Sequence, residues 1–245
     1  MTEAKSKTNK STSSAHQRPR DAATLIIVDG AETTPRVLMG KRRGDVAFMP
    51  NKFVFPGGRV DSADRDVTSL DELADSEVQK LLHDMKGHPS AARARAIALA
   101  GIREVFEETG MIIGEKGASH AATDVAGWTD FFASGYLPKL SHLCFFARAI
   151  TPPGRPRRYD TRFFCIQQKH IALDTDRQDE ELSEIAWYGL EESTQLDLPP
   201  ITRVILEDLS DQLAAGPLGP SRNAVPYYHQ RHGTFFRELI SIEGG

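Results

Sequence analysis

Three glutamates lie close together in the string REVFEETG, which runs from Arg103 to Gly110. On a helix, Glu104, Glu107 and Glu108 are spaced i, i+3 and i+4, so their side chains share one face. Like charges at this spacing repel each other by roughly 0.2–0.5 kcal/mol per pair when they are exposed. A hard divalent cation reverses that repulsion, because Mg²⁺ prefers oxygen ligands. The pattern therefore predicts a metal site, with a solvated acidic face as the alternative.

Arg103 lies one helical turn before Glu107. At this spacing the guanidinium group can orient the carboxylate through a charge-assisted hydrogen bond. We expect Arg103 and the three glutamates to work as one catalytic unit.

A second string, FPGGRVDSAD, runs from Phe55 to Asp64 and contains the paired glycines Gly57 and Gly58. Glycine lets the backbone turn tightly and lets a ligand approach it closely. The two strings occur in this order, one after a predicted strand and the other on a predicted helix. Such a combination favours a shared phosphate or metal site more than either string does alone.

Together the two strings resemble the sequence box of the Nudix hydrolases. That box reads Gly, five residues, Glu, seven residues, Arg-Glu, an apolar residue, any residue, Glu-Glu, any residue, Gly and an apolar residue. Here Gly58 is followed by five residues and then Asp64, and Arg103 to Met111 match the second half position by position. Between Asp64 and Arg103 lie 38 residues instead of seven, an excess of 31 (38 − 7). The resemblance therefore predicts a helical insertion at 65–95, inside the box.

The resemblance also implies the fold class and the reaction. The fold is α/β: an α/β/α sandwich with a mixed sheet, here with a helical insertion and a C-terminal helix. The reaction is attack of water on a diphosphate linkage, with Mg²⁺ or Mn²⁺ as the cofactor. The implied metal ligands are a backbone carbonyl near Gly57 and the carboxylates of Glu104, Glu107 and Glu108. Candidate substrate-binding residues are Gly58, Arg43 and Arg158. Arg155, Arg157 and Arg158 could together receive an extra phosphate, such as the 3′-phosphate of coenzyme A, with a basic hairpin between two strands as the alternative.

Two acidic segments add further candidates. Asp64 occupies the first Glu position of the box but is one methylene shorter, so we expect it to hold the loop, with Asp61, and not to be a principal metal ligand. The general base varies among Nudix hydrolases, so Glu104 and the acidic loop at 174–184 both remain candidates. Within that loop we single out Glu180 and Glu181, with a solvated turn as the alternative.

Two further sequence resemblances bear on the class of substrate. The string PGGRVDSAD resembles the variant box of coenzyme A diphosphatases, and ITPPGRPRRYDTRFF, from Ile150 to Phe164, resembles their peroxisomal-type branch. The upstream Leu-Arg-x-His-x-Gly-Gln-Val signature of other coenzyme A diphosphatases is absent. The resemblance implies coenzyme A or acyl-coenzyme A as substrate. Alternatives are another dinucleotide or nucleotide sugar, such as NADH or ADP-ribose, and a non-catalytic nucleotide sensor, although the three retained glutamates favour an enzyme.

Periodicity and turn residues predict the elements that must position these groups. Strands are expected at Ala23–Asp29, Arg36–Arg43, Lys52–Gly58, His142–Ile150, Arg162–Gln168, Glu184–Leu190 and Gly233–Ile240. Helices are expected at 69–86, with Ser69 as N-cap and Gly87 as stop, at Ala91–Thr109, and at Pro199–Ala215. Gly101, inside the second helix, predicts either a close contact or a break.

The bulk composition limits the class of protein. Of the 245 residues 40% are hydrophobic and 26% charged, which is typical of a soluble globular domain. The net charge of −4 argues against general nucleic-acid binding. No apolar run approaches the ~20 residues of a membrane span. We expect a cytoplasmic protein with a small-molecule nucleotide substrate.

The ends and the insertion complete the expected organisation. Residues 1–21 are rich in Ser, Thr and Lys and predict a disordered tail, followed by a single domain at 22–245. Cys144 and Cys165 lie in apolar runs and are expected to be reduced and buried. The sequence leaves open whether the insertion caps the pocket, packs on the core or forms a homodimer interface.

Overall fold

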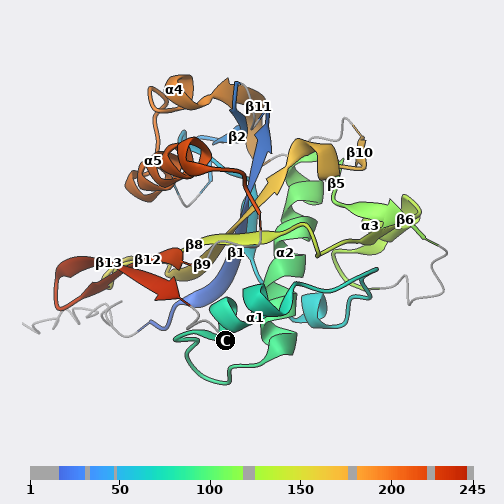
Figure 1. Ribbon diagram of the computed structural model, residues 1–245, viewed down its shortest axis with the longest axis horizontal. Coiled ribbons are helices and arrows are strands. Elements are labelled where there is room, and N and C mark those ends of the chain that lie inside the picture. Colours follow the sequence, from blue (N-terminus) through green and yellow to red (C-terminus); the bar gives the residue numbers. More distant parts are fainter. Residues whose placement is uncertain are drawn as a thin grey trace, which may run out of the picture.

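A nine-stranded mixed sheet forms the centre of the molecule, and helices cover both of its faces (Figure 1). The computed structural model describes residues 17–30, 34–46, 49–117, 125–175, 181–219 and 224–241. The strand order is β11-β2-β1-β9-β8-β12-β13, with β3 beside β2 and β4 beside β1. This architecture confirms the predicted α/β sandwich.

The elements have the following bounds. The sheet contains β1 (Arg20–Asp29), β2 (Arg36–Arg42), β3 (Phe53–Val54), β4 (Gly57–Arg59), β8 (Cys144–Ile150), β9 (Tyr159–Gln167), β11 (Leu182–Gly189), β12 (Ala224–Arg231) and β13 (Thr234–Ser241). Two small ribbons pair β5 (Met111–Ile112) with β10 (Leu173–Asp174) and β6 (Gly114–Lys116) with β7 (Tyr136–Pro138). The helices are α1 (Asp75–Leu82), α2 (Ala91–Thr109), α3 (Thr129–Ala133), α4 (Leu190–Ser193) and α5 (Pro200–Ala215), and the 3-10 turns are η2 (Ser62–Arg65) and η3 (Gln168–His170).

Strand β1 is buried on both faces. Leu25 and Ile27 pack in the core on the α2 side, whereas Ile26 and Val28 pack in the core on the α5 side. Such double burial requires a nearly continuous apolar sequence, which is what LIIV provides. The parallel partner of β1 is β9, whose start lies beside the start of β1.

Helix α2 begins and ends at the residues that the sequence predicts. The Ser90 side chain accepts a hydrogen bond from the Arg93 amide (3.2 Å), and Gly110 ends the helix with φ +75°. At Gly101 a Cβ would lie 2.2 Å from Cδ1 of Leu25 and 3.3 Å from Cβ of Ala23. Glycine therefore lets α2 approach β1 closely, which confirms the close contact expected there.

The insertion contains a shorter helix than the sequence predicts. Helix α1 spans Asp75–Leu82, and Ser69 is not its N-cap. The preceding backbone bonds to the rest of the molecule instead: the Leu70 amide donates to the Pro138 carbonyl (2.9 Å), and Asp71 accepts the Leu140 amide (2.6 Å). These tertiary hydrogen bonds replace the helical ones and delay the helix start.

Helix α1 packs on the core. Leu81 and Met85 belong to the same apolar cluster as the buried face of α2. Beside them Glu77 and Lys80 form a fully buried ion pair, and Glu77 also accepts the Phe145 amide of β8 (2.6 Å). Burial raises the pKa of Glu77, and these partners only partly offset it. The sequence leaves open three roles for the insertion. Its described residues show one of them, which is packing on the core.

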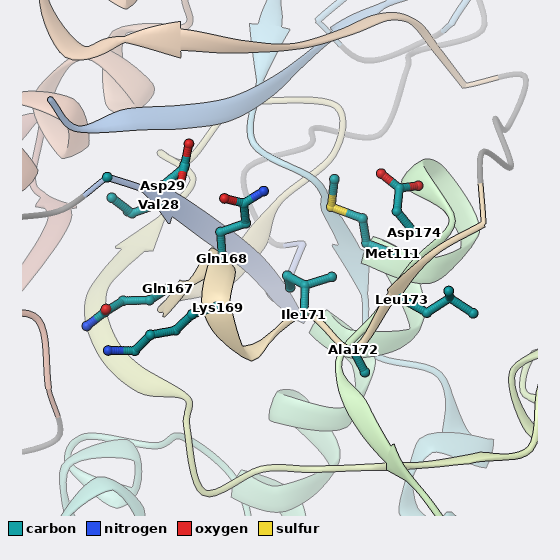
Figure 2. Close-up of a pocket in the computed structure, with 11 residues that line it drawn as sticks. Val28, Asp29, Met111, Gln167, Gln168, Lys169, Ile171, Ala172, Leu173 and Asp174 are labelled. Atoms are coloured by element: carbon teal, nitrogen blue, oxygen red, sulfur yellow. The ribbon is translucent and has the colours of Figure 1, made fainter.

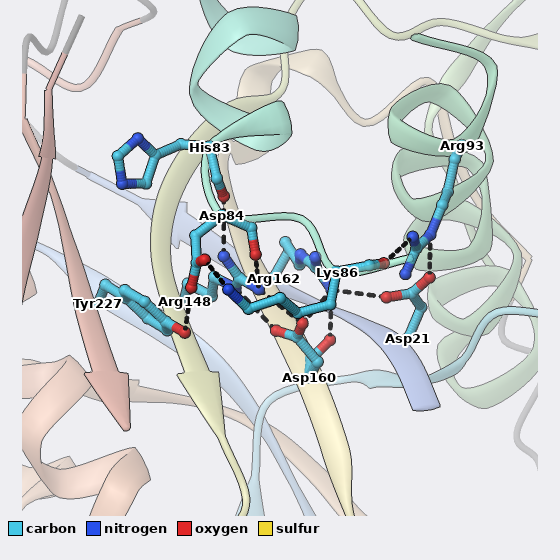
Figure 3. A network of polar contacts seen from close by, with 9 residues as sticks. All are labelled: Asp21, His83, Asp84, Lys86, Arg93, Arg148, Asp160, Arg162 and Tyr227. Atoms are coloured by element: carbon cyan, nitrogen blue, oxygen red, sulfur yellow. Dashed lines mark hydrogen bonds and ion pairs between the residues drawn. The ribbon is translucent and has the colours of Figure 1, made fainter. Parts of the chain in front are cut away.

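A buried polar network fastens the end of the insertion to the sheet (Figure 3). Arg148 of β8 makes two hydrogen bonds to Asp160 of β9 (2.8 and 2.7 Å). The same guanidinium donates to the backbone carbonyls of His83 and Asp84, just after α1 (2.9 and 3.2 Å). The planar guanidinium group of Arg148 therefore links β8, β9 and the loop that follows α1.

The start of β1 takes part in the same network. Asp21 accepts hydrogen bonds from Arg93 of α2 (2.6 Å) and Arg162 of β9 (2.7 Å). These ion pairs extend the strand to Arg20, inside the 1–21 segment that composition predicts as disordered. Residues 1–16 of that predicted tail lie outside the described part of the chain. Within the described part, no helix has the length and apolar character needed to cross a membrane.

Candidate active site

The two halves of the box meet where β4 passes the C-terminal half of α2. Strand β4 pairs with β1, which places Gly57 opposite Thr24 and Gly58 opposite Ala23. The Gly57 amide donates a hydrogen bond to Oε2 of Glu108 (2.8 Å). Tertiary structure therefore joins segments that the insertion separates in sequence.

Arg103 is the buried centre of the site. Its Nη1 donates to Glu104 and to Glu107 (both 2.9 Å), its Nε donates to Asp64 (2.9 Å), and its Nη2 donates to the Arg59 carbonyl (3.0 Å). Burial alone would lower the pKa of Arg103, but the bond to Asp64 and the charges of Glu104, Asp64 and Glu107 raise it overall. Arg103 therefore remains positively charged between the carboxylates. Its hydrogen bond to Glu107 is the contact that the helical spacing predicts.

The glutamates differ in their surroundings. Burial raises the pKa of Glu104 to about 7, although Arg103 opposes the shift. Burial also raises the pKa of Glu108 well above its ordinary value, and the charge of Glu104 adds to this effect. The Glu107 side chain is one-third exposed. Two desolvated carboxylates side by side form an oxygen donor set that a hard divalent cation would stabilise.

The described residues contain no ready-made group of three metal-binding His, Cys, Asp or Glu side chains. The hydrogen bonds explain the arrangement, because Arg103 holds Glu104 and Glu107 while the Gly57 amide holds Glu108. The carboxylates nevertheless lie on adjacent turns of one helix beside the Gly57–Gly58 backbone. Carboxylate oxygens are the type of ligand that Mg²⁺ and Mn²⁺ prefer.

A cavity of about 290 Å³ opens beside Glu104. Its lining residues come from β1, β2, β4, the start of β9 and the segment before β11: Ala22, Thr24, Arg42, Gly57, Gly58, Arg59, Glu104, Arg157, Tyr159, Thr161 and Glu181. The lining combines the carboxylates of Glu104 and Glu181 with three arginines, one of which, Arg42, pairs with Glu181. This combination suits a phosphate-containing ligand that also contacts a cation.

Of the candidate substrate arginines, Arg157 lines the cavity, whereas Arg43, Arg155 and Arg158 do not. Arg43 bonds to Asp45 in an exposed turn (3.2 Å), and Arg158 donates to the Thr151 and Gln17 carbonyls (3.1 and 2.7 Å). Arg42, which precedes Arg43 and ends β2, also lines the cavity. The next residue along an extended backbone points to the other side, which directs Arg43 away from the cavity.

Sequence reasoning did not single out Tyr159 and Thr161. These residues alternate along β9, so both side chains reach the same face of the sheet. The sequence signal for them was the alternation of side chains in the string YDT. It was missed because the strand was expected to begin only at Arg162. Asp160 lies between them, is buried, and binds Arg148 on the other face.

The acidic candidates are divided between the cavity and the interior. Glu181 lines the cavity, pairs with Arg42, and contributes by charge repulsion to the raised pKa of both Glu104 and Glu108. Glu180 lies outside the described residues. Asp64 is fully buried and bonds to Arg103, and its other oxygen accepts the Asp61 amide (2.8 Å). This placement agrees with the loop-holding role expected of Asp64.

A larger hollow of about 730 Å³ lies at the opposite end of β1 (Figure 2). Asp29, Gln168, Met111 and Asp174 are among its lining residues. None of the residues from Arg103 to Glu108 contributes to it. We therefore place the candidate active site in the smaller cavity, where the glycines, a box glutamate and the arginines converge.

Comparison with known proteins gives two informative likenesses. The protein named "Putative nudix hydrolase 7" of Caenorhabditis elegans is 31% identical over an alignment of 182 residues, and the match covers 69% of this chain and 50% of that protein. The chain thus spans about half the length of the curated relative that it matches. The crystal structure of a NUDIX hydrolase from Alicyclobacillus acidocaldarius superimposes with a TM-score of 0.58 at 23% identity, covering 84% of this chain and all of that one.

No protein-family profile matches the chain. At 23% sequence identity, the structural likeness establishes the fold alone. The curated relative adds a likeness in sequence. The chain therefore has the Nudix fold, and its sequence is similar to that of a protein named as a Nudix hydrolase.

Proposed function

We propose that the protein is a divalent-metal-dependent hydrolase that cleaves the diphosphate linkage of a nucleoside diphosphate derivative. One observation carries the proposal: Glu104, Glu108 and the Gly57–Gly58 backbone meet at the edge of a cavity that also contains arginines. A purely structural acidic face would need no glycine at position 58 and no buried carboxylates. The likeness to Nudix proteins agrees with this reaction class.

The chain would hold Mg²⁺ or Mn²⁺ through Glu104, Glu107, Glu108 and a backbone oxygen near Gly57. When bound, such an ion neutralises charge on the phosphates and lowers the pKa of a coordinated water. Arg103 orients two of the three carboxylates through Nη1. Burial of Glu104 and Glu108 keeps water from screening them, which strengthens their attraction to a cation.

Two residues are suitable as the general base. Glu104 lies at the cavity, and in the metal-free protein burial raises its pKa to about 7. Glu181 faces the same cavity from another segment of the chain. Its hydrogen bond to Arg42 orients the carboxylate, and its greater exposure allows it to meet a substrate-bound water.

Coenzyme A or an acyl-coenzyme A is the substrate that we propose first. Arg157 lines the cavity, is exposed, and forms no ion pair with another described residue. A guanidinium in this position can bind a phosphate that lies outside the metal-bound diphosphate. Coenzyme A carries such a group as its 3′-phosphate.

A substrate panel tests the proposal. The full chain is incubated with Mg²⁺ or Mn²⁺ and with coenzyme A, NADH, ADP-ribose or a nucleotide sugar, and the products are separated by chromatography. Formation of 3′,5′-ADP from coenzyme A supports the proposed substrate. Turnover of only the other compounds rejects coenzyme A but retains the reaction class. Turnover of none, combined with nucleotide binding, indicates a sensor.

The role of Arg157 is tested with coenzyme A and its 3′-dephospho form. Arg157→Ala should raise KM for coenzyme A about tenfold and leave KM for the dephospho form nearly unchanged. Arg155→Ala is the matched control, because Arg155 belongs to the same exposed turn but does not line the cavity. Equal effects on the two substrates would reject a contact between Arg157 and the 3′-phosphate.

A further inference from the structure

Trp128 lies immediately before α3 and is completely buried. Its indole ring packs against Phe131 and Phe132, with ring centroids 5.2 and 5.9 Å away. Its Nε1–H donates a hydrogen bond to Oδ1 of Asp64 (2.9 Å). A residue outside both halves of the box therefore binds the aspartate that lies in the box.

The two oxygens of Asp64 receive four donors. Oδ1 accepts Trp128 Nε1 and Arg103 Nε (both 2.9 Å), and Oδ2 accepts the Asp61 amide (2.8 Å) and Arg103 Nη2 (3.3 Å). Because the carboxylate is fully buried, no water can replace a lost donor without rearrangement. The indole is therefore an integral part of the site that holds Asp64.

The same network reaches the proposed metal ligands. Asp64 binds the guanidinium of Arg103 along one edge, through Nε and Nη2. This leaves Nη1 for Glu104 and Glu107. The group is planar and rigid, so a rotation at the Asp64 edge displaces Nη1 at the other. The adjacent Gly127 adds a steric constraint, because a Cβ there would lie 3.0 Å from Cδ of Arg103.

We propose that Trp128 is a positioning residue for the carboxylates of this site. Its indole N–H fixes Asp64, Asp64 fixes Arg103, and Arg103 holds Glu104 and Glu107 in the orientation that binds a divalent cation. The inference rests on the proposed metal-dependent function and extends it to a segment that the box does not include. The same contacts favour the short side chain of Asp64, because the longer side chain of a glutamate would extend toward the indole and Arg103.

The first test measures Mn²⁺ affinity in the absence of substrate. Trp128→Phe keeps an aromatic ring beside Phe131 and Phe132 but removes the N–H donor. Electron paramagnetic resonance titration should show Mn²⁺ binding weakened about tenfold, the lower end of the effect usual for groups that orient metal ligands. Trp187→Phe, at the second of the two tryptophans, is the matched control and should leave the affinity unchanged.

A double-mutant cycle shows whether Trp128 acts through Asp64. If it does, Trp128→Phe combined with Asp64→Ala should bind Mn²⁺ no more weakly than Asp64→Ala alone. A further tenfold loss in the double variant would overturn the inference, as would an affinity of Trp128→Phe within twofold of the unmutated protein. If the unmutated protein binds no Mn²⁺, the proposed function itself fails, which is a different outcome.

A second measurement leaves Trp128 and Asp64 unchanged. The chain has two tryptophans, so its ¹H–¹⁵N spectrum contains two indole signals, and Trp187→Phe identifies the signal of Trp128. Addition of Mg²⁺ should shift the Trp128 indole signal and leave that of Trp187 in place. A Trp128 signal that does not respond to saturating Mg²⁺ would contradict the coupling.

Discussion

Gly58 and Glu104 are in direct contact: a Cβ at position 58 would lie 2.4 Å from Oε2 of Glu104. Any side chain at Gly58 must therefore displace the carboxylate, because the backbone of β4 is held by its pairing with β1. We expect Gly58→Ala to reduce kcat/KM about 100-fold, the scale of a 1 Å misplacement at a reacting centre. Gly189→Ala is the control, since the nearest atom to its added Cβ is 4.0 Å away. Equal activity of the two variants would contradict this contact.

Glu107→Gln and Glu108→Gln should each lower turnover by at least about 100-fold, because each removes a charged oxygen donor from a metal site. Their melting temperatures should change little. For Glu108 the reason is that burial already disfavours the charged form, so a neutral side chain does not weaken the folded state. Glu115→Gln, on the exposed strand β6, controls for loss of a negative charge. Full activity in both site variants would reject the metal assignment.

Without metal, the protein should be less stable at pH 7.5 than at pH 5. The pKa of Glu104 is about 7 in the folded state against an ordinary value of 4.5, so between these values the folded state keeps a proton that the unfolded chain releases. Stability then falls as pH rises, by at most about 3 kcal/mol for 2.5 pKa units. Denaturant unfolding in EDTA at both pH values measures the effect. Glu104→Gln should flatten this dependence, and an unchanged slope in that variant would assign it to other groups.

Glu181→Gln tests the identity of the general base. If Glu181 removes the proton from water, its loss should lower kcat by about 10²–10⁴-fold and abolish the acidic limb of the pH–rate profile. Glu184→Gln is the matched control, since Glu184 lies on β11, just after Glu181, and pairs with Lys41 outside the cavity. Retention of the acidic limb in Glu181→Gln would favour Glu104 as the base.

Asp160→Asn should destabilise the protein by about 3–5 kcal/mol, because it leaves the buried Arg148 without its charged partner. The loop after α1 binds the same guanidinium, so proteolysis near His83 should also become faster. For comparison, Glu115→Gln breaks an exposed ion pair with Lys139 and should cost less than about 1 kcal/mol. Similar losses of stability in the two variants would show that the buried network (Figure 3) is not a special anchor.

The helix that carries the glutamates was predictable because its signals are local. Ser90 caps the start of α2, Gly110 ends it, and the spacing of Glu104 and Glu108 places both on one face. Strand β12 was not predicted, whereas its partner β13 was. Strand β12 contains Pro226, which lacks an amide donor and interrupts a strand pattern, yet it pairs fully with β13. Tertiary pairing here overrides a local signal.

The sequence by itself determined which groups are available for chemistry: three carboxylates on one helix face, an arginine one turn away, and a pair of glycines. Only the tertiary structure decided which residues meet them. It placed Gly58 against Glu104 across the insertion, brought Arg157 and Glu181 into the cavity, and set Trp128 on Asp64. The physical reason is that helix spacing and caps act over a few residues. Contacts between distant segments depend instead on strand register and packing, which no short stretch of sequence encodes.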